Sequence, residues 1–348
     1  MLTFFNPEHA RHDAEFEIFR GQQVPAFERA ERQERVAQRL RERGHELRVP
    51  HADAAAVLAR LHAPRYLEFL AGAWSQWLAL DPANAQRLPY ASVWPVRSLR
   101  DDVEPDNFIA RLGLYSMDNG QTVGPGTWQA GRAGADAAHS AALAVAGGVR
   151  AAFCLSRPPG HHAGPDFMGG YCFLNQAAVA AQTLRDAGAA RVAVLDVDYH
   201  HGNGTQTLFY RRSDVYFASL HGDPRTEYPF FLGHADERGA GEGLGCNLNL
   251  PLPAGSAPEA WFHALEVALA QLAAWGADAL VVSLGLDTAA EDPICRFGLT
   301  GDDFSRLGQR LAATGWPTVL VFEGGYANES LALNTVRVIE AFDTGARP

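Results

Sequence analysis

The stretch from Asp196 to Thr205, with the sequence DVDYHHGNGT, contains the side chains best suited to bind a metal. Asp196, Asp198 and His200 alternate along it, so an extended backbone would present all three on the same side. Carboxylate and imidazole groups are ligands that a divalent cation such as zinc accepts. Two glycines that follow allow the backbone to turn sharply close to such a site. The stretch therefore predicts a metal site, although a hydrogen-bonded loop clasp would also explain Asp198 and His200.

Other short apolar runs along the chain also end in residues that can do chemistry. The runs cover residues 150–156, 215–218, 277–284 and 318–322, and they end in or are followed by RPPGHH, SLH, GLD and EGGY. Asp287, in the third of these clusters, completes a candidate set with Asp198 and His200. Three protein ligands leave a coordination position free for water and substrate, as hydrolytic zinc sites require. Taken alone, Asp287 is more simply explained as a helix N-cap.

Candidate acid–base and hydrogen-bonding groups lie in the same clusters. His161 and His162 follow Pro-Pro-Gly, which restricts the backbone, although adjacent histidines are often merely buried and hydrogen bonded. A histidine can take a proton from water and return it to an amine near neutral pH. Tyr326 follows two glycines and can donate a hydrogen bond to a developing oxyanion, or cover the core. Tyr171 also follows two glycines and is expected in a channel wall, with ordinary packing as the alternative.

The elements between these clusters predict one parallel sheet. The apolar runs have the length of buried strands, and a further strand over residues 191–195 precedes the first cluster. Helices are expected over 175–187, from a Ser256-x-x-Glu259 capping box to Gly276, and after a Thr300-x-x-Asp303 box. Strands that alternate with helices, without tight hairpins, indicate an α/β fold with helices on both faces of the sheet. Ligands bind at the carboxyl ends of such strands, so the clusters are expected to meet in one crevice.

Length and composition favour one large domain over residues 1–348. The chain has 348 residues, of which 47% are hydrophobic, and no Ser/Gly/Pro-rich linker or internal repeat divides it. It contains no long uncharged apolar run and no signal-peptide pattern at its start, so we expect no membrane association. The four cysteines form no CxxC pair, which favours reduced thiols and a cytoplasmic location.

The charge of the chain bears on its partners. A net charge of −11 disfavours nucleic acid and favours a cationic small molecule. The arginine-rich stretch from Glu28 to Arg48 is interleaved with glutamates, and we interpret it as a solvated helix face.

Taken together, the clusters resemble the motif series of the histone deacetylase superfamily. The matching segments, in family order, are residues 157–162, 170–175, 196–206, 219–221, 284–287 and 323–326. The resemblance covers about residues 1–340, and six motifs in order are highly specific. It implies the arginase–deacetylase fold, an α/β fold with a central parallel β-sheet flanked by helices on both faces.

The resemblance also implies a role for each matching side chain. The implied zinc ligands are Asp198, His200 and Asp287. His162 resembles the general base and acid, His161 its electrostatic partner, and Tyr326 the residue that stabilises the oxyanion. Asp196 would orient His161 and Asn203 would orient His162; the asparagine matches the class II pattern, where many class I members have aspartate. The residues that match a structural potassium site are Asp196, Asp198, His200, Ser219 and Leu220.

Within the superfamily, the chain most resembles bacterial acetylpolyamine amidohydrolases. The similarity lies in residues 5–9, 15–17, 24–27 and 125–128, and in a long segment, about residues 74–126, that is an insertion relative to ordinary deacetylases. In that subfamily the insertion builds a homodimer and narrows the pocket mouth. Glu17 matches an acidic residue that meets the distal ammonium of a polyamine, and Tyr228 an aromatic channel residue. Ile109 stands where a second acidic residue is expected, which favours short acetylated diamines over long polyamines unless Asp106 or Glu104 compensates.

The expected function is therefore zinc-dependent removal of acetyl groups from acetylated polyamines or diamines. A deacylase of acetyl-lysine in proteins shares every catalytic residue, but a narrowed mouth would exclude a folded substrate. A ureohydrolase holds two manganese ions and needs a further carboxylate where this chain has Ala289. A non-catalytic acyl-ligand binding protein would be expected to have lost a ligand or the tyrosine, and this chain retains them all.

Overall fold

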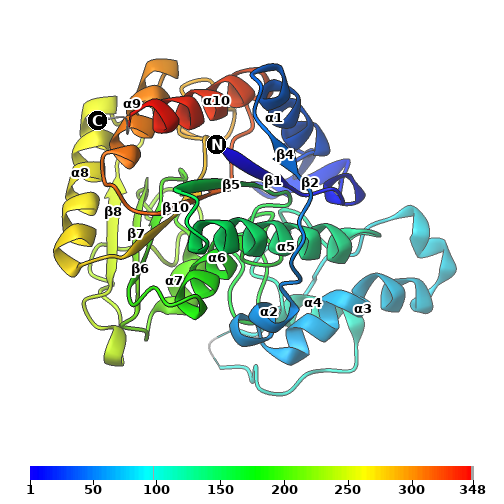
Figure 1. The fold of residues 1–348 in the computed structure, drawn as a ribbon. Helices are drawn as coiled ribbons and strands as arrows, with labels where there is room; N and C mark the ends of the chain where they lie inside the picture. The colour runs from blue at the N-terminus through cyan, green and yellow to red at the C-terminus, as the bar shows by residue number, and fades with distance from the viewer. Residues whose placement is uncertain (97, 346–348) are drawn as a thin grey trace.

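An eight-stranded parallel sheet forms the centre of the molecule, as the sequence predicts (Figure 1). The computed structural model describes residues 1–96 and 98–345. Residue 97, inside the predicted insertion, and residues 346–348 of the predicted domain lie outside the described residues. The strands are β1 (Leu2–Phe5), β4 (Leu47–Arg48), β5 (Ala151–Leu155), β6 (Val192–Asp196), β7 (Val215–Gly222), β8 (Asn247–Leu252), β9 (Ala279–Leu284) and β10 (Thr318–Phe322). Their order across the sheet is β4-β1-β5-β10-β9-β6-β7-β8.

The strand order brings four of the predicted clusters together. After β5 the chain crosses over to form β6, β7 and β8 toward one edge, and it returns later to insert β9 and β10 between β6 and β5. The strands β5, β10, β9 and β6 are therefore consecutive neighbours, and all pair in parallel. Their carboxyl ends lie at the same edge of the sheet, where a change of strand order creates a crevice for ligands.

Helices cover both faces of the sheet (Figure 1). On one face pack α2 (Ala55–Leu61), α3 (Pro64–Leu80), α4 (Phe108–Leu114), α5 (Thr127–Ala146), α6 (Gln176–Asp186) and α7 (Asn203–Phe209). On the other pack α1 (Ala30–Glu42), α8 (Pro258–Trp275), α9 (Gly301–Ala312) and α10 (Asn328–Thr344). Each face of the sheet packs against its helices in a separate hydrophobic core, and alternate residues of β6 pack into the two cores. Val192 and Val194 point to the first core, and Ala193 and Leu195 to the second. Short 3-10 turns occur at His9–Arg11, Pro82–Gln86 and Gly241–Gly243.

A tight hairpin near the N-terminus contradicts the prediction that the chain has none. Strands β2 (Phe16–Phe19) and β3 (Gln22–Pro25) pair antiparallel outside the main sheet. Arg20 and Gly21 connect them with φ values of 51° and 78°. Two consecutive positive φ values are typical of a two-residue hairpin turn, which Asn-Gly or Asp-Gly signals more clearly than Arg-Gly. The weak turn signal explains why the pattern along the sequence missed it.

One of the two predicted capping boxes is wrong. Helix α8 begins at Pro258 after Ala257, with no side-chain cap, because proline at the first position needs no hydrogen-bond acceptor for its nitrogen. The Ser256 hydroxyl instead donates to the Pro253 carbonyl at 2.7 Å. The box formed by Thr300 and Asp303 at the start of α9 is confirmed.

The prediction of a solvated arginine-rich helix is wrong for part of α1. Arg32 is fully buried, and so is Glu28 just before the helix, whereas Arg35 and Arg41 are exposed. Arg32 and Glu28 form an ion pair of 2.8 Å inside the protein. The interleaved charges of this segment therefore belong to two environments, which charge patterning along the sequence does not separate.

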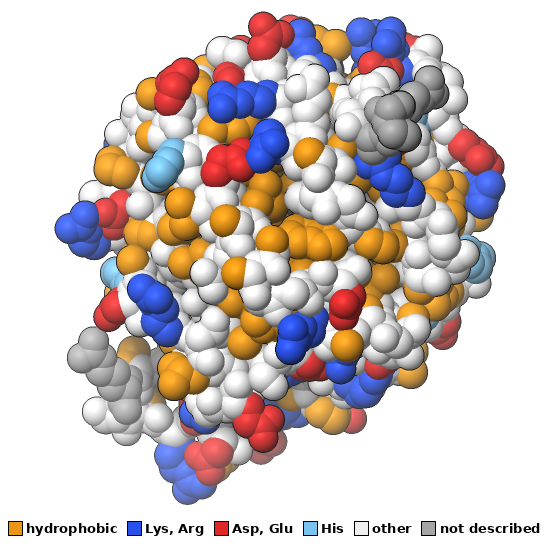
Figure 2. Space-filling view, turned by 60° about the vertical axis from the view of Figure 1, so that its left-hand side comes forward, with side chains coloured by type: hydrophobic (Ala, Val, Ile, Leu, Met, Phe, Trp, Pro, Cys, Tyr) orange, Lys and Arg blue, Asp and Glu red, His pale blue; other side chains and the backbone are white. Residues whose placement is uncertain are grey.

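The face in Figure 2 carries acidic and basic side chains spread around a central band of hydrophobic ones. Neither sign of charge forms a continuous patch on this face. None of the helices that the structure describes is long and apolar enough to cross a membrane.

Candidate active site

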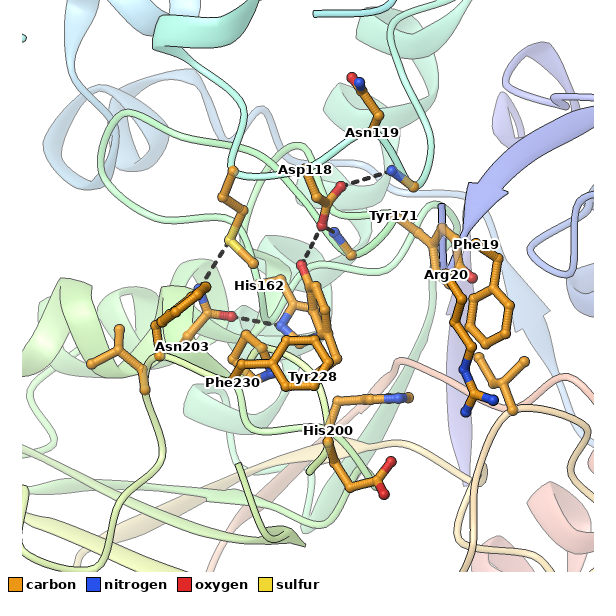
Figure 3. Close-up of a pocket in the computed structure, with 18 of the residues that line it drawn as sticks. Phe19, Arg20, Asp118, Asn119, His162, Tyr171, His200, Asn203, Tyr228 and Phe230 are labelled. Atoms are coloured by element: carbon orange, nitrogen blue, oxygen red, sulfur yellow. Dashed lines mark hydrogen bonds between the residues drawn. The ribbon is translucent and has the colours of Figure 1, made fainter. Parts of the chain in front are cut away.

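The carboxyl ends of β5, β10, β9 and β6 surround a cavity of about 710 Å³. Its lining includes six of the residues singled out from the sequence: His162, Tyr171, His200, Asn203, Tyr228 and Tyr326. Figure 3 labels all of them except Tyr326. Asn203, also on the lining, is the first residue of α7, directly after the metal-site stretch. The predicted convergence is therefore confirmed for the clusters that follow β5, β6 and β10, whereas residues 219–221 lie buried within β7 and do not line the cavity.

His200 lies within contact distance of the other two candidate metal ligands. His200 Nδ1 is 3.3 Å from Asp198 Oδ1 and 3.1 Å from Asp287 Oδ2. Ligand atoms at roughly 2.0–2.2 Å from a tetrahedral zinc ion lie roughly 3.2–3.6 Å apart, so both distances from His200 are close to those of a zinc site. The remaining oxygens are held by the backbone, because Asp198 Oδ2 accepts from Gly324 N at 2.9 Å and Asp287 Oδ1 from Tyr199 N at 2.8 Å. These bonds fix the carboxylates, and Asp287 is not a helix N-cap.

Two glycines leave the space that this ligand set needs. A Cβ atom at Gly285 would lie 2.0 Å from Asp198 Oδ2, and one at Gly324 would lie 2.6 Å from the same oxygen and 2.7 Å from Asp287 Oδ2. Any side chain at either position would displace a carboxylate. The glycines after β9 and β10 are therefore required by the close approach of the backbone to the ligands.

The two adjacent histidines have different hydrogen-bond partners. His161 Nδ1 lies 3.0 Å from Asp196 Oδ2, and His162 Nδ1 lies 2.7 Å from Asn203 Oδ1. Burial opposes the charge on His161, but the Asp198 and Asp196 carboxylates outweigh it and raise its pKa to about 10. Burial, and then the charge of His161, hold the pKa of His162 well below its usual value. At neutral pH the pair therefore consists of a charged His161 beside a neutral His162.

Because the Asn203 oxygen can only accept, His162 Nδ1 carries the proton of the neutral ring, which leaves Nε2 with a free lone pair. A neutral imidazole with a free nitrogen at a cavity wall is suited to act as a general base.

Tyr326 is anchored at the cavity wall by its backbone and its ring. Its N–H donates to Asp292 Oδ2 at 2.7 Å, and its ring packs edge-on against that of Tyr171 at 5.6 Å. Burial raises the pKa of the Tyr326 phenol well above its usual value, so the hydroxyl keeps its proton. A buried phenol that stays protonated is available as a hydrogen-bond donor.

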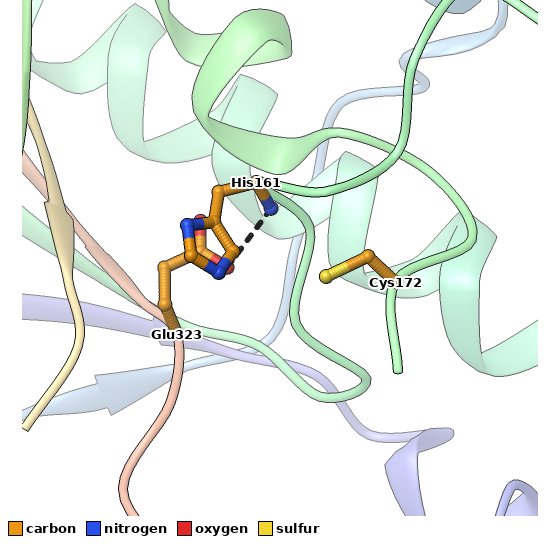
Figure 4. Close-up of side chains that lie close together, drawn as sticks. All are labelled: His161, Cys172 and Glu323. Atoms are coloured by element: carbon orange, nitrogen blue, oxygen red, sulfur yellow. Dashed lines mark hydrogen bonds between the residues drawn. The ribbon is translucent and has the colours of Figure 1, made fainter. Parts of the chain in front are cut away.

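Glu323 clamps the loop that carries the histidines (Figure 4). Its Oε2 accepts from Gly160 N at 2.6 Å and from His161 N at 3.2 Å, and burial raises its pKa to about 7. His161, Cys172 and Glu323 have potential ligand atoms within 4.8 Å of one another. Since Asp196 binds the His161 ring and backbone N–H groups bind Glu323, we interpret this group as a structural clasp.

A buried network that the sequence interpretation missed supports Tyr326 from behind. Arg32 donates to the carbonyls of Glu323 and Gly325, both at 2.6 Å, and its guanidinium lies 4.7 Å from the Tyr326 ring centroid. Glu28 joins Arg32 to the fully buried Arg157 through ion pairs of 2.8 Å. Of these three charged residues, only Arg157 belongs to a segment that the sequence pattern singled out, because it begins the RPPGHH cluster.

Cys295 is another residue close to the site that the sequence interpretation missed. Its sulfur lies within 4.8 Å of potential ligand atoms of His200 and Asp287. It belongs to no CxxC pair, so nothing in its local sequence indicates that position.

The aromatic wall of the cavity contains Tyr171 and Tyr228, as predicted. The Tyr228 ring meets His162 edge-on at 5.0 Å, and its hydroxyl donates to Asp118 Oδ2 at 2.5 Å. Glu17 lies behind this wall, fully buried, and does not line the cavity. It accepts from the Tyr171 hydroxyl at 2.8 Å and from Phe27 N at 2.9 Å. Contact between Glu17 and a substrate ammonium stays a prediction, and it would require Tyr171 to give up this bond.

Glu17→Ala is expected to destabilise the protein because both donors would lose their acceptor inside the wall. Each buried donor left unpaired costs roughly 1–3 kcal/mol of unfolding free energy. Thermal and urea unfolding measure the effect, with Glu15→Ala, an exposed glutamate of the same segment, as the control. Equal stabilities of the two variants would show that the Glu17 contacts contribute little.

The residues matched to a potassium site lie around the end of β6. Asp196 pairs in register with Ser219 on β7, and Asp196 Oδ1 accepts from Asp198 N at 3.1 Å. Leu220 follows on β7 and is fully buried. Ile109, a residue of α4, packs partly buried against the core and does not line the cavity.

Known proteins are similar to this chain over nearly its whole length. Residues 26–342 match the model of the histone deacetylase domain. Acetylpolyamine amidohydrolase 2 from Pseudomonas aeruginosa is 48% identical over 99% of this chain and 99% of its own length. Acetylpolyamine amidohydrolase from Mycoplana ramosa is 42% identical over 98% of this chain and 99% of its own length.

Solved structures share the fold. A crystal structure of acetylpolyamine aminohydrolase from Burkholderia pseudomallei has a TM-score of 0.93 at 40% identity, covering 99% of both chains. The HD domain of HDA15 has a TM-score of 0.76 at 26% identity, covering 99% of this chain and 91% of its own. Together with the parallel sheet, these similarities confirm the arginase–deacetylase fold.

Proposed function

Because the chain belongs to the histone deacetylase family, we propose that it is a zinc-dependent deacetylase that hydrolyses acetylated polyamines or short acetylated diamines to acetate and free amine. The observation that carries the proposal is one cavity holding His200 of the ligand set, His162 and Tyr326. Relatives named for acetylpolyamine hydrolysis match nearly the whole chain, which supports this substrate class over acetyl-lysine in proteins.

In this proposal, Asp198, His200 and Asp287 hold one zinc ion per chain. Bound there, zinc supplies a Lewis acid for the acetamide carbonyl and lowers the pKa of a water molecule. His162 takes a proton from the attacking water through Nε2 and later delivers it to the departing amine. The Tyr326 hydroxyl donates to the carbonyl oxygen as negative charge develops on it.

The charged His161 beside His162 has an electrostatic role in the same scheme. It stays protonated between Asp196 and Asp198, and burial together with the charge of His161 keeps the resting His162 neutral. Asn203 holds His162 in the tautomer that presents Nε2. No cysteine takes part in these steps.

We also propose a structural potassium ion at Asp196, Asp198, His200, Ser219 and Leu220. Support comes from the family resemblance and from the register that sets Ser219 beside Asp196. The cytoplasmic location remains a proposal that rests on the free cysteines.

Turnover of acetylputrescine, acetylcadaverine, acetylspermidine and an acetyl-lysine peptide by the purified protein tests the substrate class. We expect the acetylated diamines to be hydrolysed with the highest kcat/KM. A higher kcat/KM for the peptide would favour protein deacylation instead.

A homodimer formed through residues 74–126 is the expected oligomer. Phe108 and Leu112 of this segment are buried in their own core, but several large apolar side chains remain exposed: Leu80, Val93, Val96, Leu99 and Val103. Exposed apolar side chains concentrated in one segment are typical of an interaction surface. Light scattering is expected to give the mass of two chains at micromolar concentration, and a monomer mass would contradict the dimer.

A further inference from the structure

We propose that Arg20 and Arg296 admit a second substrate class to this cavity, acetylated amines whose far end is a carboxylate. The inference goes beyond the proposed function but rests on it, because the same catalytic residues would release the acetate. Both arginines line the cavity, and both are exposed to solvent. Apart from histidines, the other charged side chains that line it, among the described residues, are Asp118 and Glu227.

The two carboxylates of the lining are less open to a ligand than the arginines. Asp118 accepts hydrogen bonds from two backbone N–H groups at 2.9 Å and from the Tyr228 hydroxyl at 2.5 Å (Figure 3). Glu227 is 6% exposed, and its Oε1 is shielded from the cavity and lies beside the Tyr199 hydroxyl. The most accessible charges of the lining are therefore positive.

The guanidinium of Arg20 is held at the cavity by an aromatic ring. Its central carbon lies 5.0 Å from the centroid of the Phe19 ring, and no hydrogen bond joins it to the other lining residues drawn in Figure 3. Phe19 in turn packs against the cluster of Tyr171, Ile294 and Tyr326. A guanidinium stacked on a ring keeps its N–H groups, which lie in its own plane, available for a planar carboxylate.

The backbone at Arg20 also supports a role for its side chain. Its φ of 51° lies in the left-handed region, which residues with long side chains rarely adopt. Asn, Asp or Gly would form this turn of the hairpin with less strain. Residues in such unfavourable conformations occur preferentially at functional sites, where the surrounding structure maintains them. The preference of the turn itself therefore does not explain why an arginine stands there.

Arg296 reaches the same wall of the cavity from the loop that follows β9. It comes directly after Ile294 and Cys295, and both of these pack in the aromatic cluster that Phe19 joins. Its side chain is 54% exposed, and its Nη1 lies 4.0 Å from Glu227 Oε1, beyond hydrogen-bond distance. Because the immediate neighbours of Arg20 and Arg296 share one cluster, the two arginines lie on the same wall.

This arrangement suits a linear substrate with an acetamide at one end and a carboxylate at the other. The acetamide would lie at the catalytic histidine and tyrosine, and the aliphatic chain along the aromatic wall. Arginine binds carboxylates through paired N–H donors, so the two guanidinium groups can receive the far end. A cavity of about 710 Å³ is within the range of small-molecule sites and has room for the chain. The same charges repel a substrate that ends in an ammonium.

The test compares acetate release from three substrates that share five methylene groups and differ only at the far end. They are 6-acetamidohexanoate, its neutral amide 6-acetamidohexanamide, and acetylcadaverine. For the wild-type protein we expect kcat/KM for the carboxylate to exceed that for the amide roughly tenfold, the lower end of the range for charge-assisted hydrogen bonds. High salt should reduce this advantage, because it screens exposed charges.

Replacing either arginine separates recognition of charge from support of the wall. Arg20→Gln and Arg296→Gln are each expected to lower kcat/KM for the carboxylate several-fold, mainly through KM, and to raise it for acetylcadaverine. The neutral amide should change little in both variants. Loss of a purely structural contact would instead slow all three substrates alike. Arg238→Gln, which changes an exposed arginine outside the cavity lining, is the matched control and should keep the wild-type values.

Three results would overturn the proposal. The first is a wild-type kcat/KM for the carboxylate that does not exceed that for the amide. The second is a loss in the two arginine variants that affects all three substrates equally. The third is hydrolysis of acetylcadaverine without hydrolysis of 6-acetamidohexanoate, which would leave the proposed function intact. Release of acetate from none of the three by the wild-type protein would overturn the proposed function and this inference with it.

Discussion

Replacing Asp287 with alanine is expected to remove the metal from the protein and to abolish measurable deacetylation. Asp287 Oδ2 lies 3.1 Å from His200 Nδ1, close to the separation of two zinc ligands, and its other oxygen accepts from Tyr199 N. Without it, Asp198 and His200 retain two ligand atoms, too few for a tightly held catalytic zinc. The loss of zinc affinity should therefore exceed the roughly tenfold to hundredfold loss that is usual when a residue that hydrogen-bonds a metal ligand is replaced.

Metal analysis of the purified protein measures this effect. We expect one zinc per chain in the wild type and close to none in Asp287→Ala. Asp236→Ala, which changes an exposed aspartate away from the cavity lining, should retain the wild-type metal content. Full zinc occupancy in Asp287→Ala, or two catalytic metals per wild-type chain, would count against the ligand assignment.

Tyr326→Phe is expected to lower kcat by roughly 10²–10³ while largely preserving fold and metal content, the usual loss for one oxyanion donor. The substitution keeps the ring that packs against Tyr171 and lies beneath the Arg32 guanidinium. The backbone bond from Tyr326 N to Asp292 does not depend on the side chain. Only the hydroxyl that donates to the developing negative charge is removed.

Tyr171→Phe is the matched control for that substitution, because it deletes another phenol from the same cavity. The Tyr171 hydroxyl bonds to Glu17 inside the wall, so its loss should reduce kcat much less. Comparable kcat losses in the two variants, or a Tyr326→Phe protein with most of its wild-type turnover, would reduce Tyr326 to a packing residue.

The sequence by itself determined the strands and helices that carry the chemistry and the candidate residues at their ends. Buried strands such as β6 and β9 are apolar except for Asp196 at the end of β6 and Ser283 in β9, and more polar residues follow where the strands end. Both features are local, so they are visible without knowledge of the fold. The convergence of Asp198 and Asp287 followed from one general property of parallel sheets, that their carboxyl ends meet at a common edge.

The family resemblance added what local pattern could not supply. It named the roles of His161, His162 and Asn203, and the structure places each beside the partner that these roles require, apart from zinc. The series of six motifs in order, rather than any single motif, made that step specific.

Only the tertiary structure decided which charged residues are buried and which face the cavity. Arg32 and Arg35 both occur in one helix of interleaved charges, but Arg32 lies against the Tyr326 loop and Arg35 in solvent. Glu17 belongs to a short hairpin that places it behind Tyr171, whereas Arg20 of the same hairpin lines the cavity. Burial and partners depend on contacts between segments more than a hundred residues apart, such as Glu28 with Arg157. These contacts cannot be predicted from the local sequence, because the stability of an ionised side chain depends on the groups that surround it in three dimensions.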